Sequence, residues 1–200
     1  MELNQLFVYR NDIIESAKDK NGFVQQNEIL TEVLPLLLDA KLVDSEDYTD
    51  CYHHSENIKL NGYSVNETGE RLQLFVLNDQ SLNTTNEAEL CISQRLDYDK
   101  QFKQAIKFVD SALKGDLDEV QESEPIKPLI SKITSAEGIN QFDVIEIFAI
   151  SLTATVVRRC EDIQPKRIYF AEEYKDIKYR KNGEKQQKNF MIVKQLIDLN

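Results

Sequence analysis

The sequence predicts an α/β fold in which a mixed β-sheet is flanked by helices. Three observations support this class. Apolar residues recur at helical spacing over the first 40 residues, two strand-like segments joined by turn residues follow, and an Ile- and Phe-rich run of strand length lies at 143–152. Helices that alternate with strands of different character are typical of a sheet packed between helical layers.

Apolar spacing predicts two helices before the strands. The first occupies residues 3–17 and ends before Asn21-Gly22, a pair that favours a turn. The second carries an apolar stripe over residues 29–38 with Pro35 inside it. Because proline lacks a backbone N–H, we expect a kink or a new turn at this residue.

Two further helices are expected after the hairpin described below. The longer one begins at a capping Thr84 or Thr85 and ends at Gly115. An acidic connection at 116–125 follows it, and a short helix is expected over 126–136. The whole chain, residues 1–200, is expected to form a single domain.

The segments 58–65 and 71–77 predict a β-hairpin, because the five residues 66–70 between them have turn chemistry. A five-residue loop would place Asn61 opposite Phe75 and Tyr63 opposite Gln73. One face would then carry Leu60, Leu72, Leu74 and Val76, and the other Asn61, Tyr63, Gln73 and Phe75. A slip of one residue would exchange these faces.

The C-terminal third predicts more strands. The run 143–152 fits a fully buried central strand. Shorter strands are expected at 167–170, 174–180 and 190–199, the last two joined through Asn182-Gly183 and a lysine-rich loop.

Charge is unevenly distributed along the chain. The net charge is −11, but residues 158–200 contain 11 Lys or Arg and 7 Asp or Glu, a net of +4, which leaves −15 for the other 157 residues. The overall charge disfavours loose binding of nucleic acid. The basic segment is either a solvated surface, a contact with an acidic part of a longer chain, or an edge that binds nucleic acid. The candidate nucleic-acid-binding residues are Arg180, Lys181, Lys185 and Lys188.

Composition also bounds location and metal chemistry. No signal peptide or membrane-spanning run is apparent, so we expect a cytoplasmic protein without a membrane partner. Three cysteines favour reduced thiols over a disulfide framework. The cluster of Cys51, His53 and His54 supplies too few ligands for a closed zinc site, so ordinary surface or strand-edge residues are the simpler interpretation.

Common catalytic motifs are missing from the sequence. The six glycines form no phosphate-binding loop, and no Gly-x-Ser-x-Gly elbow occurs. Neither of the two histidines accompanies an obvious nucleophile. We therefore expect no resident cofactor.

The order of several pieces resembles the N-terminal domain of abortive-infection phage-resistance (AIPR) proteins. The pieces are Asn61-Gly62-Tyr63-Ser64, the strand Leu72 to Val76, a long helix, Glu122-Ser123-Glu124-Pro125, a buried strand over 144–152 and the closing pair Asp198-Leu199. The resemblance implies that the chain is the N-terminal domain of a longer protein in phage defence. The expected partner is the C-terminal region of that protein, with a homo-oligomer as a second arrangement.

The same layout resembles a restriction-endonuclease-like core, which implies a Mg²⁺ site built from carboxylates and a lysine on neighbouring strands. The matching positions here are Asn61, Gln73 and Phe75, so two acids are replaced by amides and the lysine by an aromatic ring. Glu28 and Glu32 on the second helix are the remaining acidic candidates.

These observations leave three functions open. The first is a non-catalytic module with a nuclease-like fold and a degenerate site. The second is a metal-dependent nuclease that uses Mg²⁺. The third is a nucleic-acid-binding domain without catalysis, in which Tyr169, Phe170, Tyr174 and Tyr179 lie among the basic residues.

Overall fold

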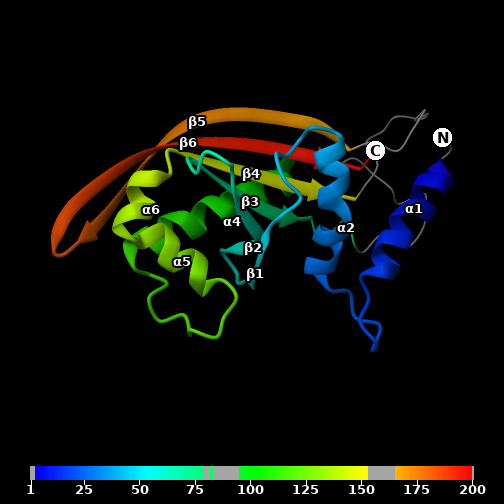
Figure 1. The fold of residues 1–200 in the computed structure, drawn as a ribbon, viewed down its shortest axis with the longest axis horizontal. Helices are drawn as coiled ribbons and strands as arrows, with labels where there is room; N and C mark the ends of the chain where they lie inside the picture. The colour runs from blue at the N-terminus through cyan, green and yellow to red at the C-terminus, as the bar shows by residue number, and fades with distance from the viewer. Residues whose placement is uncertain (1–2, 79–81, 83–94, 153–164, 200) are drawn as a thin grey trace.

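The computed structural model describes residues 3–78, 82, 95–152 and 165–199. These residues form a six-stranded mixed sheet in the order β1-β2-β3-β4-β6-β5, with helices packed against it (Figure 1). The predicted α/β class with a mixed sheet flanked by helices is confirmed.

The described helices and strands follow one another in a simple order. The helices are α1 (Leu3–Ser16), α2 (Gln26–Asp39), α4 (Arg95–Lys114), α5 (Lys127–Thr134) and α6 (Ala136–Gln141). The strands are β1 (Thr49–His54), β2 (Lys59–Val65), β3 (Arg71–Leu77), β4 (Val144–Ser151), β5 (Lys166–Lys181) and β6 (Glu184–Asp198). Strands β1, β2 and β3 are antiparallel neighbours, β4 is parallel to both β3 and β6, and β5 is antiparallel to β6.

The two faces of the sheet bury separate apolar cores. One core packs α4, α5 and α6 against residues such as Leu72, Leu74 and Ile147. The other packs α1 and α2 against the carboxyl ends of β3, β4 and β6, where Phe75 and Phe148 stack with ring centroids 5.4 Å apart. Strand β4 is therefore buried on both faces, as its apolar sequence predicts.

The helices agree with the sequence in most respects. Helix α2 continues through Pro35 as one helix, and α4 ends at Gly115, which has a φ of +82°. The proposed caps at Thr84 and Thr85 lie outside the described residues. The helix expected over 126–136 is α5, which ends at Thr134. The sequence did not predict α6, which follows because Ser135 adopts an extended backbone and its Oγ accepts a hydrogen bond from the Gly138 N–H.

The hairpin exists, but its predicted register is wrong by one residue. Gly62 pairs with Phe75 and Tyr63 pairs with Leu74. The side chain of Asn66 accepts a hydrogen bond from the Arg71 N–H at 2.9 Å, and the Asn66 N–H donates to the Arg71 carbonyl at 3.2 Å. The strands therefore pair one residue further than expected and leave a loop of four residues, 67–70. Tyr63 lies in the core that contains Leu74, not with Asn61 as predicted.

The C-terminal strands form a long hairpin arm, which we define as β5 and β6 with the Asn182-Gly183 turn between them. The sequence predicted two separate strands over 167–180 and a lysine-rich loop after the turn, and this was wrong. Strand β5 is continuous and β6 begins directly after the turn. Asn182 and Gly183 have φ values of 52° and 82°, which suit a two-residue hairpin turn.

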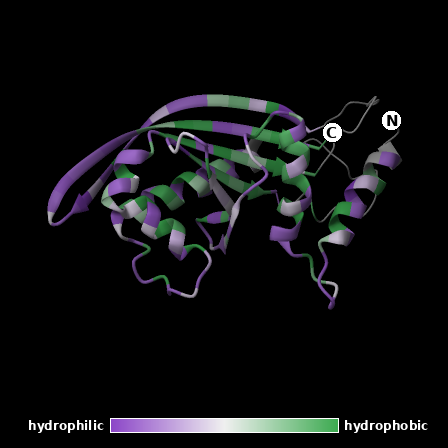
Figure 2. Ribbon diagram, in the orientation of Figure 1, coloured by the Kyte–Doolittle hydropathy of each residue, from purple (hydrophilic) through white to green (hydrophobic). Residues whose placement is uncertain are grey.

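The arm extends beyond the rest of the molecule at its turn end (Figure 1). Figure 2 shows that this end is hydrophilic, whereas the strands in the centre of the sheet are hydrophobic. Near the turn, residues on both faces of these strands are exposed. The sequence there has no alternation of apolar and polar residues, so it gave no sign of a strand.

Strand β1, which the sequence did not predict, forms the other edge of the sheet. Its burial alternates weakly, and its pairing with β2 shifts register between Asp50 and His53. A short, polar edge strand with an irregular register is a poor template for further strand pairing.

Replacing Phe148 with Ala should lower the free energy of unfolding by about 3 to 5 kcal/mol, because the ring is fully buried and its loss leaves a cavity beside Phe75. Urea unfolding followed by circular dichroism measures this. Phe23→Ala is the matched control, since Phe23 is 68% exposed and its loss should change stability by less than about 0.5 kcal/mol. Equal losses in both variants would contradict the packing described for β4.

Candidate functional site

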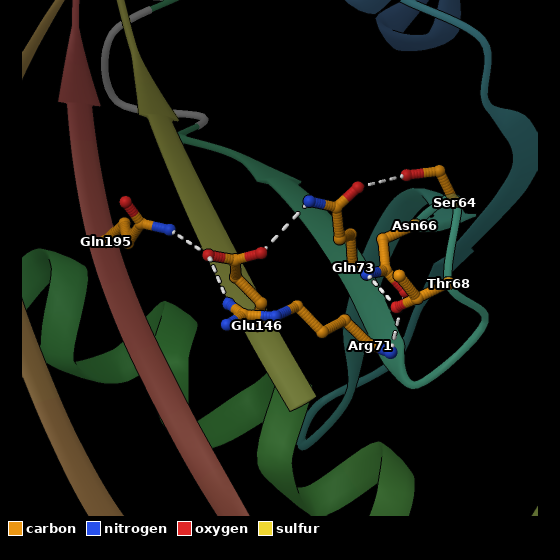
Figure 3. Close-up of polar contacts among 7 residues, drawn as sticks. All are labelled: Ser64, Asn66, Thr68, Arg71, Gln73, Glu146 and Gln195. Carbon is orange, nitrogen blue, oxygen red and sulfur yellow. Dashed lines mark hydrogen bonds and ion pairs between the residues drawn. The ribbon is translucent and has the colours of Figure 1, made fainter. Parts of the chain in front are cut away.

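A row of polar side chains crosses the middle of the sheet on the face that α1 and α2 share. It consists of Ser64 on β2, Gln73 on β3, Glu146 on β4 and Gln195 on β6, and we call it the polar row (Figure 3). It lies at the margin of the α1–α2 core, because Gln73 and Glu146 come two residues before the core residues Phe75 and Phe148 on β3 and β4.

The pairing of the strands brings the polar row together. Ser64 is opposite Gln73 across β2 and β3, and Gln73 is opposite Glu146 across β3 and β4. Gln195 lies opposite Phe148 on β6, two residues along the strand from the partner of Glu146. Four strands therefore each supply one polar group at nearly the same level of the sheet.

Glu146 is the centre of the polar row and only 8% exposed. Its Oε2 accepts a hydrogen bond from the Gln73 side-chain amide at 3.0 Å, and its Oε1 accepts one from the Gln195 side-chain amide at 2.5 Å. The Arg71 guanidinium lies 4.0 Å from Oε1. Both oxygens of this buried carboxylate therefore have hydrogen-bond donors, and a cation lies nearby.

The hydrogen bonds continue outward from Gln73. Its Oε1 accepts a hydrogen bond from the Ser64 hydroxyl at 2.8 Å. Gln73 and Ser64 line an open cleft of 560 Å³ whose walls include Asp44, Asp47 and Tyr48. Glu146 itself is not among the residues that line this cleft.

The polar row has the chemistry of a hydrogen-bonded carboxylate more than that of a cation site. Both amides turn their NH₂ groups toward Glu146, so neither offers its oxygen to an ion there. A hard cation such as Mg²⁺ needs several oxygen ligands, usually with one or two carboxylates. Within the described ranges, no group of three or more Asp, Glu, His or Cys residues is placed to hold a metal.

Of the three positions proposed for a degenerate nuclease site, only Gln73 belongs to the polar row. The Asn61 side chain is fully buried elsewhere, donating to Gln26 Oε1 at 2.7 Å and accepting from the Leu77 N–H at 2.8 Å. Phe75 is a core residue stacked on Phe148. Both Asn61 and Gln73 are buried.

The two acids proposed on α2 do not join Gln73 in the structure. Glu28 and Glu32 are exposed. Each of them lies close enough to a tyrosine to affect its pKa. Burial raises the pKa of Tyr9, and the charge of Glu32 raises it further. Burial also raises the pKa of Tyr48, and the charge of Glu28 acts in the same direction.

Cys51, His53 and His54 lie on β1, the edge strand of the sheet. Cys51 is fully buried in the core under α4, and burial raises the pKa of its thiol, which disfavours the thiolate that binds metals. His53 Nδ1 lies 3.8 Å from Glu124 Oε2 in the acidic connection. His54 is exposed on the same strand.

The basic candidates all lie on the hairpin arm but in different surroundings. Lys188 donates to Asp143 at 2.6 Å, so its charge is already partnered. Lys181 lines a small cleft with Asp118 of the acidic connection. Arg180 and Lys185 are exposed and line a larger cleft, of 610 Å³, at the turn end of the arm.

Sequence reasoning missed Glu146 as a site residue. A charged residue inside a strand that reads as buried on both faces was the available signal, because such a residue must find partners on neighbouring strands. Which strands would supply them depends on the order of the sheet, and the sequence did not specify that order.

A second buried acid, Asp198, lies at the carboxyl end of β6, opposite Ser151 of β4. Both of its carboxylate oxygens are buried without a hydrogen-bond partner in the described part of the chain. Burial raises the pKa of Asp198 to about 8. The Leu199 N–H opposes this shift only in part, because it donates its hydrogen bond to the Ser151 carbonyl at 3.2 Å.

Comparison with known proteins identifies one family. The model of the abortive infection phage resistance protein N-terminal domain matches residues 31–181. Searches of curated proteins and of solved structures found no match. No helix in the described ranges is long and apolar enough to cross a membrane.

The buried acid gives a pH-dependent stability. Because the folded pKa of Asp198 is about 8 and the unfolded value is near 4, its protonated form stabilises the fold at low pH, and this contribution falls as pH rises from about 4 to about 8, by at most about 1.4 kcal/mol per pH unit. Urea unfolding across this range should show a shallower loss in Asp198→Asn than in the wild type. The exposed Asp116→Asn is the control, and parallel curves for Asp198→Asn and the wild type would count against the assignment.

Proposed function

This chain belongs to the family of abortive infection phage resistance protein N-terminal domains, and we propose that it is a non-catalytic module with a nuclease-like fold and a degenerate site. The single observation that carries the proposal is the environment of Glu146. Its two oxygens accept hydrogen bonds from amides where a nuclease would hold a cation.

The polar row supports a nuclease-like fold better than the three positions proposed from the sequence, Asn61, Gln73 and Phe75. The resemblance to a restriction-endonuclease-like core implies acids on two neighbouring strands, with a lysine two residues after the second acid. Gln73 and Glu146 are direct partners on β3 and β4, and Phe148 stands two residues after Glu146. Glu146 thus keeps one acid, Gln73 replaces the other with an amide, and Phe148 puts a buried aromatic ring at the lysine position.

The missing groups remove the chemistry that cleavage needs. A hydrolytic Mg²⁺ polarises the phosphate and activates water, and its affinity depends on the negative charge of its ligands. Glu146 alone supplies one negative charge, and Arg71 at 4.0 Å offsets part of it. The amide donors stabilise the carboxylate without a metal, so the fold does not depend on an ion here.

One observation favours the alternative, a metal-dependent nuclease. Gln73 lines the 560 Å³ cleft together with Asp44 and Asp47, so carboxylates other than Glu146 lie near the polar row. Against this alternative, Glu146 lies outside the cleft lining and its oxygens are already taken by the amides. The metal titration below separates the two functions.

As an N-terminal domain in phage defence, the module is proposed to act through association. The proposed partner is the C-terminal region of the same protein, and the alternative is a second copy of this chain. Its task would then be to hold or regulate another part of the defence protein in the cell, without cleaving nucleic acid itself.

Restoring a carboxylate should restore a cation site. In Gln73→Asp, a second acid would face Glu146 across β3 and β4, so calorimetry with Mn²⁺ should show saturable binding that the wild type lacks. The double variant Gln73→Asp with Glu146→Gln should lose this binding. Asn61→Asp is the matched control, since it places an acid on the same hairpin away from Glu146 and should bind no Mn²⁺.

The same titration can reject the proposal. Saturable Mn²⁺ binding by the wild type that disappears in Glu146→Gln, accompanied by Mn²⁺-dependent cleavage of DNA, would establish the nuclease alternative.

A further inference from the structure

One face of the hairpin arm carries cations and exposed aromatic rings in a single line. The pairing of β5 with β6 is regular from Tyr169 to Lys181, so alternate residues of β5 share a face. The face that continues from Gln195 of the polar row carries, along β5, Phe170, Glu172, Tyr174, Asp176, Lys178 and Arg180.

The turn end of this face is strongly cationic. Lys178, Arg180 and Lys185 line the 610 Å³ cleft, whose wall also includes Lys114 from the end of α4 on the other face of the sheet, and no acidic residue of the described chain lines it. Lys114 pairs with Asp110 at 2.8 Å. The other three form no ion pair within the described residues.

Arg180 and Lys185 are directly opposite each other across the two strands. Like charges at opposed positions destabilise a hairpin, and neither of these two residues forms an ion pair within the described residues. An anionic ligand would remove the repulsion, so the arrangement is unfavourable alone and favourable when a polyanion is bound.

Large rings are exposed further along the same face. Tyr174 is 74% exposed and Phe170 is 49% exposed, and the Arg167 guanidinium lies 5.4 Å from the Phe170 ring centroid. Aromatic rings beside a cationic groove suit unpaired bases, which stack on them while the phosphates meet the cations. An acidic peptide would use the cations but would leave these rings in water.

We propose that the hairpin arm binds single-stranded nucleic acid along this face, with bases on Phe170 and Tyr174 and phosphates at Lys178, Arg180 and Lys185. From Phe170 to Arg180 the face is about 33 Å long at about 3.3 Å per residue, enough for several nucleotides. This binding is separate from the proposed function, because it needs neither a metal nor Glu146.

The acidic character of the rest of the chain does not prevent this binding. Lys178, Arg180 and Lys185 lie near the Asn182-Gly183 turn, at the end of the arm that extends beyond the rest of the molecule (Figure 1). Charges in solution are screened beyond about 8 Å at physiological salt, so the local potential of the arm decides binding there. Glu172 lies between the two rings, and Asp176 lies between Tyr174 and the cations, where the Asn189 amide donates a hydrogen bond to it at 2.7 Å.

The test is fluorescence anisotropy of the 200-residue chain with a labelled oligothymidylate and a labelled oligouridylate, each of 20 nucleotides, over a range of salt concentrations. The variant Lys178→Glu/Arg180→Glu/Lys185→Glu should bind at least tenfold more weakly. Its plot of log affinity against log salt should be shallower by about 2, since each phosphate contact on a single strand contributes about 0.7.

A matched control changes the same charge elsewhere. Lys20→Glu/Lys103→Glu/Lys132→Glu alters three exposed lysines outside the arm and should bind within about twofold of the wild type. Tyr174→Ala should weaken binding about fivefold or more at unchanged salt dependence, because it removes a stacking ring and no charge. Circular dichroism confirms that each variant is folded.

Three results would overturn the proposal. The first is that the wild type fails to bind either oligonucleotide at low salt. The second is that the triple variants of the arm and of the control weaken binding equally. The third is that polyglutamate competes as well as the oligonucleotides while Tyr174→Ala has no effect. The last result would identify the arm as a site for acidic protein. Loss of oligonucleotide binding leaves the Mn²⁺ titration of Gln73→Asp unaffected, so the two proposals fail separately.

Discussion

The parallel strand β4, buried on both faces, constrains the rest of the structure. It pairs with β3 on one side and β6 on the other, and its side chains enter both cores. Strands in this position are ordinarily apolar throughout, because a charge there loses its water. Glu146 breaks that rule, so the neighbouring strands must each present a donor at its level. The positions of Gln73 and Gln195 follow from that requirement.

The same requirement supports our proposal that the polar row holds no cation. Gln195 directs its NH₂ group at Glu146 and leaves its own Oε1 buried without a partner in the described residues. An unsatisfied amide oxygen costs free energy, which the charge-assisted hydrogen bond to Glu146 offsets. A cation beside Glu146 would have to displace both amide groups. Amide side chains on both sides of one carboxylate thus serve as a metal-free way to keep a buried charge.

The sequence predicted those parts of the fold that depend on local pattern. Strand β4, the helices α1, α2 and α4, and the existence of the β2–β3 hairpin all follow from apolar spacing and turn residues. The hairpin register did not, because the Asn66 side chain closes the turn through a hydrogen bond to Arg71 that residue types alone do not specify. The hairpin arm was divided wrongly because its strands are solvated on both faces near the turn, so the two-residue alternation disappears.

The candidate site depended on contacts between distant segments, and the sequence could therefore supply only one of its members. Gln73 was found from its place on the hairpin, whereas Glu146 lies 73 residues later and meets it only through the parallel pairing of β3 and β4. The cations of the arm were found from composition alone. What separates Arg180 and Lys185 from Lys188 is the partner of each, since Asp143 already neutralises Lys188.

The polar row and the arm share one face of the sheet, which gives the two proposals a common geometry. Gln195 pairs with Phe148 on one side and with Phe170 on the other, so the buried carboxylate and the first exposed ring of the arm are separated by a single strand. A nucleic acid lying along the arm would therefore end beside Glu146. In a nuclease that position would place a phosphate at a cation. In the proposed non-catalytic module, the phosphate would instead meet a carboxylate whose oxygens accept hydrogen bonds from two amides, which suits our proposal that the chain holds a strand without cleaving it.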